Sequence, residues 1–243
     1  MSLLSARERS AVCSTLERIG PDAPTLCGDW NTSELAAHLV MREGHPAAAG
    51  IALDFLADWT RRTQQSLAAT DFDTLVQRVR NGPPWWSPLG WPRLESAANA
   101  LELFIHHEDI LRAQAGWQPR TLTSGDRDEL WGLLRRRARL LLRHSPVAVE
   151  LLNVDVLNVD VLNVEPRNVE LQNVDLRNVE IDQGNARGRM LVPARHSSDE
   201  PVTLSGTAAE LALYLHGRQS HAEVIVTGPA DAVERFKSSS LAV

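Results

Sequence analysis

The spacing of apolar residues over the first 145 positions predicts a series of amphipathic helices. Residues 5–8 match a capping box, and apolar side chains then recur on one helical face, so we expect a helix over residues 5–19. Similar patterns predict helices at residues 35–41, 47–68, 94–113 and 126–143, and a shorter one after Asp71. Short connections between helices that each carry one apolar face predict an up-and-down four-helix bundle over residues 1–145.

The pattern changes after Pro146, where short runs of apolar and β-branched residues predict strands. We expect strands at residues 147–151, 202–204 and 221–226, and helices at residues 207–216 and 230–236. These elements predict a small α/β domain over residues 146–243. The predicted fold class is therefore α+β.

A five-residue repeat interrupts this second domain, within an insertion at about residues 153–188. It begins with Val154-Asp155-Val156-Leu157-Asn158 and recurs to about residue 183. Successive copies rotate by about 140° on a helix and alternate faces on a strand, so neither element gains a continuous apolar side. The units resemble pentapeptide-repeat proteins, whose fold is a square β-solenoid. So short a solenoid lacks stacked neighbours, and we favour a surface insertion.

Composition and charge exclude several classes of partner. The net charge of −6 and a pI near 5.8 disfavour nucleic acid and anionic membranes. Charged residues from Arg7 onward interrupt any apolar leader, and no long uncharged apolar segment follows, so we expect a cytoplasmic protein without a membrane span. Cys13 and Cys27 lack paired spacing and are expected to be reduced structural thiols, not nucleophiles.

One helix carries a narrow polar stripe among apolar residues. Relative to Glu102 at 0°, His106 falls near 40°, Asp109 near −20° and Asn99 near 60°, at about 100° per residue. A buried stripe of this kind requires partners, because an unpaired buried carboxylate or imidazole costs several kcal/mol. His107 projects about 100° from His106, so we expect it outside the stripe and cheap to substitute.

A divalent cation would satisfy this stripe. Glu102 and His106 are one helical turn apart and can share an ion, and His38, on a short helix among apolar residues, is the natural third ligand. Three N/O ligands with a fourth position open to water are typical of catalytic zinc. The alternatives are a hydrogen-bonded core histidine at His38, a helix-surface pair of Glu102 with His106, and a solvated polar patch at residues 106–109.

Residues 30–39 and 99–109, WNTSELAAHL and NALELFIHHED, resemble the two signature segments of the DinB-like metalloproteins. The most similar branch is that of the actinobacterial mycothiol-dependent maleylpyruvate isomerases. The resemblance implies a four-helix bundle with the metal triad His38, Glu102 and His106, followed by a small α/β domain. Residues 206–218 also resemble that family's C-terminal domain, which implies that Arg218 reaches a carboxylate or thiol ligand. The alternative is an arginine at a helix C-terminus.

These expectations define the function to be tested. We expect a divalent-metal protein, with zinc the best match, that acts as a mycothiol-dependent transferase or isomerase on a small molecule. Arg218 and Asp109 are the candidate substrate-binding residues. The alternatives are a non-catalytic metal or small-molecule binding module, and a scaffold whose active surface is the repeat.

Overall fold

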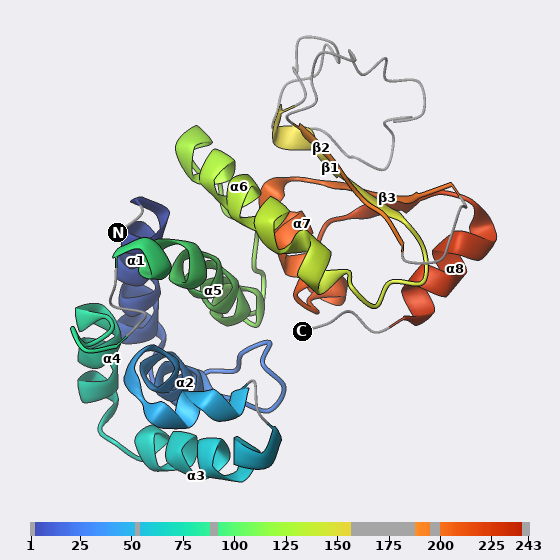
Figure 1. The fold of residues 1–243 in the computed structure, drawn as a ribbon. Coiled ribbons are helices and arrows are strands. Elements are labelled where there is room, and N and C mark those ends of the chain that lie inside the picture. Colours follow the sequence, from blue (N-terminus) through green and yellow to red (C-terminus); the bar gives the residue numbers. More distant parts are fainter. Residues whose placement is uncertain (1–2, 52–53, 88–91, 157–187, 195–199, 240–243) are drawn as a thin grey trace. The chain divides into compact units, whose positions relative to one another are not determined.

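The computed structural model describes residues 3–51, 54–87, 92–156, 188–194 and 200–239 (Figure 1). The chain divides into two compact units, Met1–Thr121 and Leu122–Val243. The first unit is helical and the second combines helices with a four-stranded sheet, so the mixed α+β class is confirmed. None of the helices among the described residues is long and apolar enough to cross a membrane.

The first unit contains five α-helices among its described residues, close to the positions that the sequence pattern predicts. They are α1 (Leu3–Ile19), α2 (Thr32–Gly44), α3 (Ala57–Ala68), α4 (Phe72–Asn81) and α5 (Pro92–Arg112). Figure 1 shows α1 beside α5 and α2 beside α3, as their contacts require.

Local capping explains where two of these helices begin. At the start of α2, the Asn31 side chain accepts from the Glu34 amide while the Glu34 carboxylate accepts from the Asn31 amide, which forms a capping box. Asp71 caps α4 by accepting a hydrogen bond from the Thr74 amide. The capping box predicted at residues 5–8 is wrong, because α1 already begins at Leu3.

The prediction of one helix over residues 47–68 is wrong for the first half of that range. Two 3₁₀ turns, Pro46–Ile51 and Asp54–Leu56, precede an α-helix that begins at Ala57. Gly50 lies in this region, and a glycine within a helix costs about 1 kcal/mol relative to alanine. The shortened α3 keeps its packing against α2.

The core of the first unit lies between α1, α2, α4 and α5. Its members are apolar side chains with essentially no exposure: Val12, Cys13, Leu16, Leu35, Ala36, Ala37, Leu39, Leu75, Val76, Val79, Leu103 and Ile110. Burial raises the pKa of the Cys13 thiol to about 11, which keeps it protonated near neutral pH. Cys13 is therefore a packing residue, as the sequence indicates.

A buried ionic network joins α1 to α5 and to the chain that follows α5. The Glu8 carboxylate lies 3.0 Å from His107 Nδ1 and 3.1 Å from the Arg120 guanidinium. Arg120 also donates to Glu108 over 2.5 Å. Burial raises the pKa of Glu8, but the hydrogen bond from His107 and the charge of Arg120 outweigh it, so the pKa lies below its ordinary value of 4.5.

Glu8→Gln should change how the stability of the protein depends on pH. Because the pKa of Glu8 is lower in the folded state, its ionised form stabilises the fold above about pH 4.5 and loses that effect as pH falls through the folded-state pKa. We expect the variant to be less stable at pH 7 and to lose less stability between pH 5 and pH 3. Urea midpoints across this range test the prediction; parallel pH profiles for both proteins would contradict it.

The second unit starts with α6 (Ser124–Leu141), which packs against α7 (Ala208–Leu215). The sequence pattern placed this helix in the first domain, with a boundary at residue 145, whereas the compact units divide after Thr121. Its buried leucines and Trp131 belong to the core of the second unit because they face elements of that unit.

The sheet of the second unit has the strand order β2-β1-β3-β4. Its strands are β1 (Val149–Asn153), β2 (Arg189–Val192), β3 (Val202–Gly206) and β4 (Ile225–Thr227). β1 and β3 are parallel, and each pairs with its outer neighbour in antiparallel orientation. The pattern predicts three of these strands and misses β2, whose four residues are too short for a periodic signal.

The start of the predicted insertion is part of this fold. Asp155 accepts from the Ala208 amide at the first turn of α7 over 2.9 Å and from Arg127 of α6 over 3.2 Å. Residues 157–187, which hold most of the repeat, lie outside the described residues. A deletion that tests the repeat should therefore begin after Val156.

Candidate metal centre

His106 lies at the centre of the candidate site, on the buried face of α5, with 8% of its surface exposed. Its Nδ1 atom lies 2.9 Å from Oδ2 of Asp109, a residue without exposed surface. An ionised carboxylate only accepts hydrogen bonds, so Nδ1 carries the proton in this pair. In the neutral imidazole the other nitrogen, Nε2, then holds the lone pair that a metal needs.

His106 lies near both of the other residues predicted as ligands. Nε2 lies 3.8 Å from Glu102 Oε2, and the His106 ring centroid is 5.1 Å from that of His38. Two N/O ligands of one tetrahedral zinc lie about 3.3 Å apart, and two bound imidazoles have centroids about 5.2 Å apart. The sequence-predicted residues His38, Glu102 and His106 are thus neighbours in the fold. Among the described residues, however, the group whose ligand atoms all lie within 4.8 Å of one another is Cys27, His106 and Asp109.

His38 is a partly buried residue, and one of its ring nitrogens has no hydrogen-bond partner in the protein. Its Nδ1 atom is buried without a hydrogen-bond partner. Its ring has two aromatic neighbours, His106 at a centroid distance of 5.1 Å and Trp30 at 5.2 Å. Burial, together with the charge of nearby His106, lowers the pKa of His38 to about 3, so it is neutral at pH 7. A neutral imidazole is the form that ligates metals.

Arg42 balances the charge of Glu102. Its Nε atom lies 3.5 Å from Glu102 Oε2, and its Nη1 atom donates to Asn99 Oδ1 over 2.8 Å. Arg42 follows His38 by one helical turn on α2, so the helix that supplies one predicted ligand also supplies the cation beside another. An ion at Glu102 would have to compete with this guanidinium.

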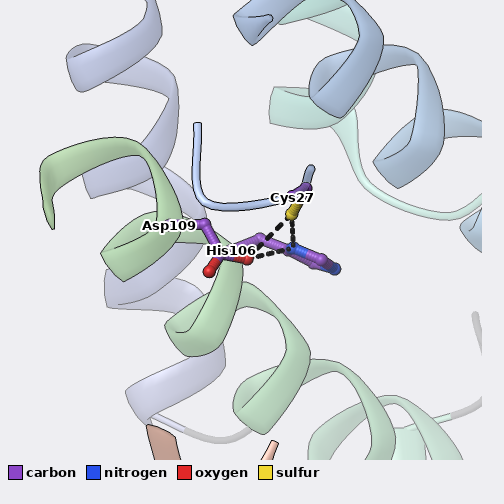
Figure 2. Close-up of side chains that lie close together, drawn as sticks. All are labelled: Cys27, His106 and Asp109. Atoms are coloured by element: carbon purple, nitrogen blue, oxygen red, sulfur yellow. Dashed lines mark hydrogen bonds and ion pairs between the residues drawn. The ribbon is translucent and has the colours of Figure 1, made fainter. Parts of the chain in front are cut away.

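The Nδ1 side of His106 carries a second group of potential ligands, which Figure 2 shows. Cys27 Sγ lies 3.0 Å from Asp109 Oδ2 and 3.7 Å from His106 Nδ1. Ligand atoms of these three residues all lie within 4.8 Å of one another, so the cluster could hold a metal ion. Cys27 comes from the loop before α2, whereas the other two side chains come from α5.

Sequence reasoning missed Cys27 as a site residue. It is separated from His106 by 79 positions and has no paired spacing with another ligand. The contact arises because the loop packs against the end of α5, where the Leu26 amide donates to the Asp109 carbonyl over 3.0 Å. The polar stripe on α5 was the available signal, since it required partners from elsewhere in the fold.

Comparison with known proteins finds no relative of this chain. No family model, curated protein or solved structure matches this chain. The assignment of function therefore depends on the site.

The remaining predicted residues have well-defined surroundings. Arg218 lies in the second unit, just after α7, and its guanidinium donates to the His216 carbonyl over 2.5 Å. This contact matches the helix-end alternative for Arg218. The full burial of Asp109 and its contacts with His106 and Cys27 favour a role in orienting His106 over direct contact with a substrate.

The expectation that His107 is a surface residue is wrong. Only 3% of its surface is exposed, and its ring nitrogens lie 3.0 Å from Glu8 Oε2 and 2.9 Å from Thr15 Oγ1. The angular argument places it correctly outside the stripe, but α1 covers that side of α5. His107 is therefore structural.

A cavity of about 480 Å³ lies beside His38, and its lining residues do not include the polar residues of α5. The lining residues come from α2, α3 and the loop before α2: Trp30, Glu34, His38, Ala57, Thr60, Arg61, Gln64 and Gln65. This volume is in the usual range for small-molecule sites. A molecule in the cavity would touch the imidazole of a predicted metal ligand.

Proposed function

We propose that this protein binds one divalent cation, best matched by zinc, through His38, Glu102 and His106. The observation that carries the proposal is the direction of the His106 hydrogen bond. Asp109 accepts the hydrogen bond from Nδ1–H, so the lone pair is on Nε2, the nitrogen that lies 3.8 Å from Glu102 Oε2. This carboxylate–histidine arrangement is the usual outer support of a zinc-bound imidazole.

The unmet polar group of His38 supports the same assignment. A buried nitrogen without a partner costs about 1–3 kcal/mol, and coordination would remove that cost. The Cys27 side differs, because hydrogen bonds of 2.9 and 3.0 Å to Asp109 already satisfy its polar groups. We therefore place the principal ion on the Nε2 side.

We further propose that the bound ion acts in a mycothiol-dependent transfer or isomerisation of a small molecule. Three protein ligands leave a fourth position for water, thiol or substrate, and a divalent ion there would acidify that ligand. The cavity beside His38 supports a small-molecule substrate. The resemblance of residues 30–39 and 99–109 to the DinB-like family supports the thiol co-substrate.

Metal content of the purified protein tests the ligand assignment. We expect about one zinc per chain in the wild type after reconstitution, and a zinc affinity at least tenfold weaker in His38→Ala and in Glu102→Gln. His45→Ala is the matched control, because it removes an exposed histidine from the end of the same helix. Equal zinc affinity in wild type and His38→Ala would refute the triad.

Activity is a separate measurement. In the transfer reaction, zinc-loaded protein should consume mycothiol in the presence of an electrophilic small molecule; in the isomerisation, it should convert the substrate only when mycothiol is present, without consuming it. His38→Ala should do neither. One zinc per chain with neither thiol consumption nor thiol-dependent isomerisation would favour the non-catalytic binding module.

A further inference from the structure

Potential metal ligands lie near both ring nitrogens of His106, and those near Nδ1 differ in their donor atoms from those near Nε2. A thiol, an imidazole nitrogen and a carboxylate meet there at Cys27, His106 and Asp109 (Figure 2). The residues predicted to bind an ion together with Nε2, His38 and Glu102, offer only nitrogen and oxygen ligands. The difference in donor atoms is the basis of a difference in metal preference.

The distances on the Nδ1 side are close to those of a coordinated ion. The 3.7 Å between Cys27 Sγ and His106 Nδ1 compares with about 3.5 Å for sulfur and nitrogen ligands of one tetrahedral zinc. The two contacts to Asp109 Oδ2, at 2.9 and 3.0 Å, are shorter by a few tenths of an ångström than ligand pairs of about 3.3–3.5 Å. Cys27 lies in a loop, so a small shift of this loop can open the cluster.

We infer that Cys27, His106 and Asp109 form a second metal site, selective for thiophilic cations such as Cd²⁺. A thiolate ligand favours soft cations far more than imidazole or carboxylate does. The site goes beyond the proposed zinc triad and does not depend on it.

The two sites exclude each other because they share one imidazole. A neutral imidazole has one unprotonated nitrogen, so His106 ligates through Nδ1 or through Nε2. A cation at Cys27 also takes Asp109 away from the Nδ1 proton that it accepts in the present structure. When a cation occupies the thiol site, His106 can therefore no longer bind an ion through Nε2.

Cd²⁺ titration of the full chain, followed by thiolate-to-metal charge-transfer absorption in the ultraviolet, tests this site. We expect the absorption in wild type, Cys13→Ala and His38→Ala, and its loss in Cys27→Ser with at least a tenfold weaker Cd²⁺ affinity. Cys13→Ala is the matched control, since Cys13 is the other cysteine of the chain. Absorption that survives in Cys27→Ser would overturn the site.

Two further measurements use the wild-type protein, so their results do not depend on whether a variant folds. In wild type, Cd²⁺ should protect Cys27 from alkylation at least tenfold, as followed by peptide mass spectrometry; unprotected Cys27 would overturn the site. Adding Cd²⁺ to zinc-loaded protein should release one zinc per Cd²⁺ bound, and simultaneous retention of both ions would overturn the exclusion. Zinc loss in His38→Ala with normal Cd²⁺ absorption in that variant would support both sites.

Discussion

His106→Ala should remove metal from both sides of the site at once. In the two proposed sites, His106 would supply Nε2 to the triad and Nδ1 to the Cys27 cluster. We expect zinc and Cd²⁺ affinities to fall by more than about 100-fold, because loss of an outer partner alone costs 10–100-fold. Competition with a chromophoric chelator measures both affinities.

The same substitution should also destabilise the metal-free protein. Asp109 is fully buried and would lose the hydrogen bond from Nδ1, at a cost of about 1–3 kcal/mol. Urea unfolding in the presence of chelator isolates this effect from the stabilisation that a native-state ligand adds. One zinc per chain in His106→Ala, with wild-type affinity, would show that neither proposed site holds the ion.

His107→Ala should lower stability strongly and leave metal affinity within about twofold of wild type. The side chain bridges Glu8 and Thr15 inside the first unit, and its loss leaves two buried polar groups with fewer partners. We expect a loss of about 2–3 kcal/mol and a melting temperature lower by roughly 10 °C. Thermal unfolding with chelator present is the measurement.

The control for this variant is His144→Ala, which removes an exposed histidine and should change the melting temperature by no more than a degree or two. His107→Gln should fall between the two, since its amide can replace part of the hydrogen bonding. A large loss of zinc affinity in His107→Ala, at a temperature where the variant is folded, would show that His107 belongs to the metal site.

Neighbouring histidines on one helix thus have different roles. His106 and His107 differ by about 100° in direction on α5, so one faces α2 and the other faces α1. The angular pattern of the sequence separates them correctly. The angular pattern cannot show whether the face of α5 that carries His107 is exposed to solvent or covered by protein, because that depends on which helix packs there.

The positions of secondary structure elements were predicted where the signal is local. Asn31 and Glu34 cap α2 within four residues of each other, and the uninterrupted helical run of α5 lies within two residues of its predicted bounds. Helix caps and helical periodicity depend on residues that are close in sequence. The short strand β2 and the split before α3 lack such a signal.

By itself the sequence determined the mixed α+β class and the polar stripe on α5, whereas the choice of His38, Glu102 and His106 as ligands of one ion stays a prediction. The tertiary structure alone decided that Cys27 joins His106 and Asp109, that Arg42 balances Glu102, and that α6 packs with the second unit. The physical reason is the range of each effect. Periodicity fixes the face on which a side chain lies, within a few residues, whereas its partner across the fold depends on how separate elements pack.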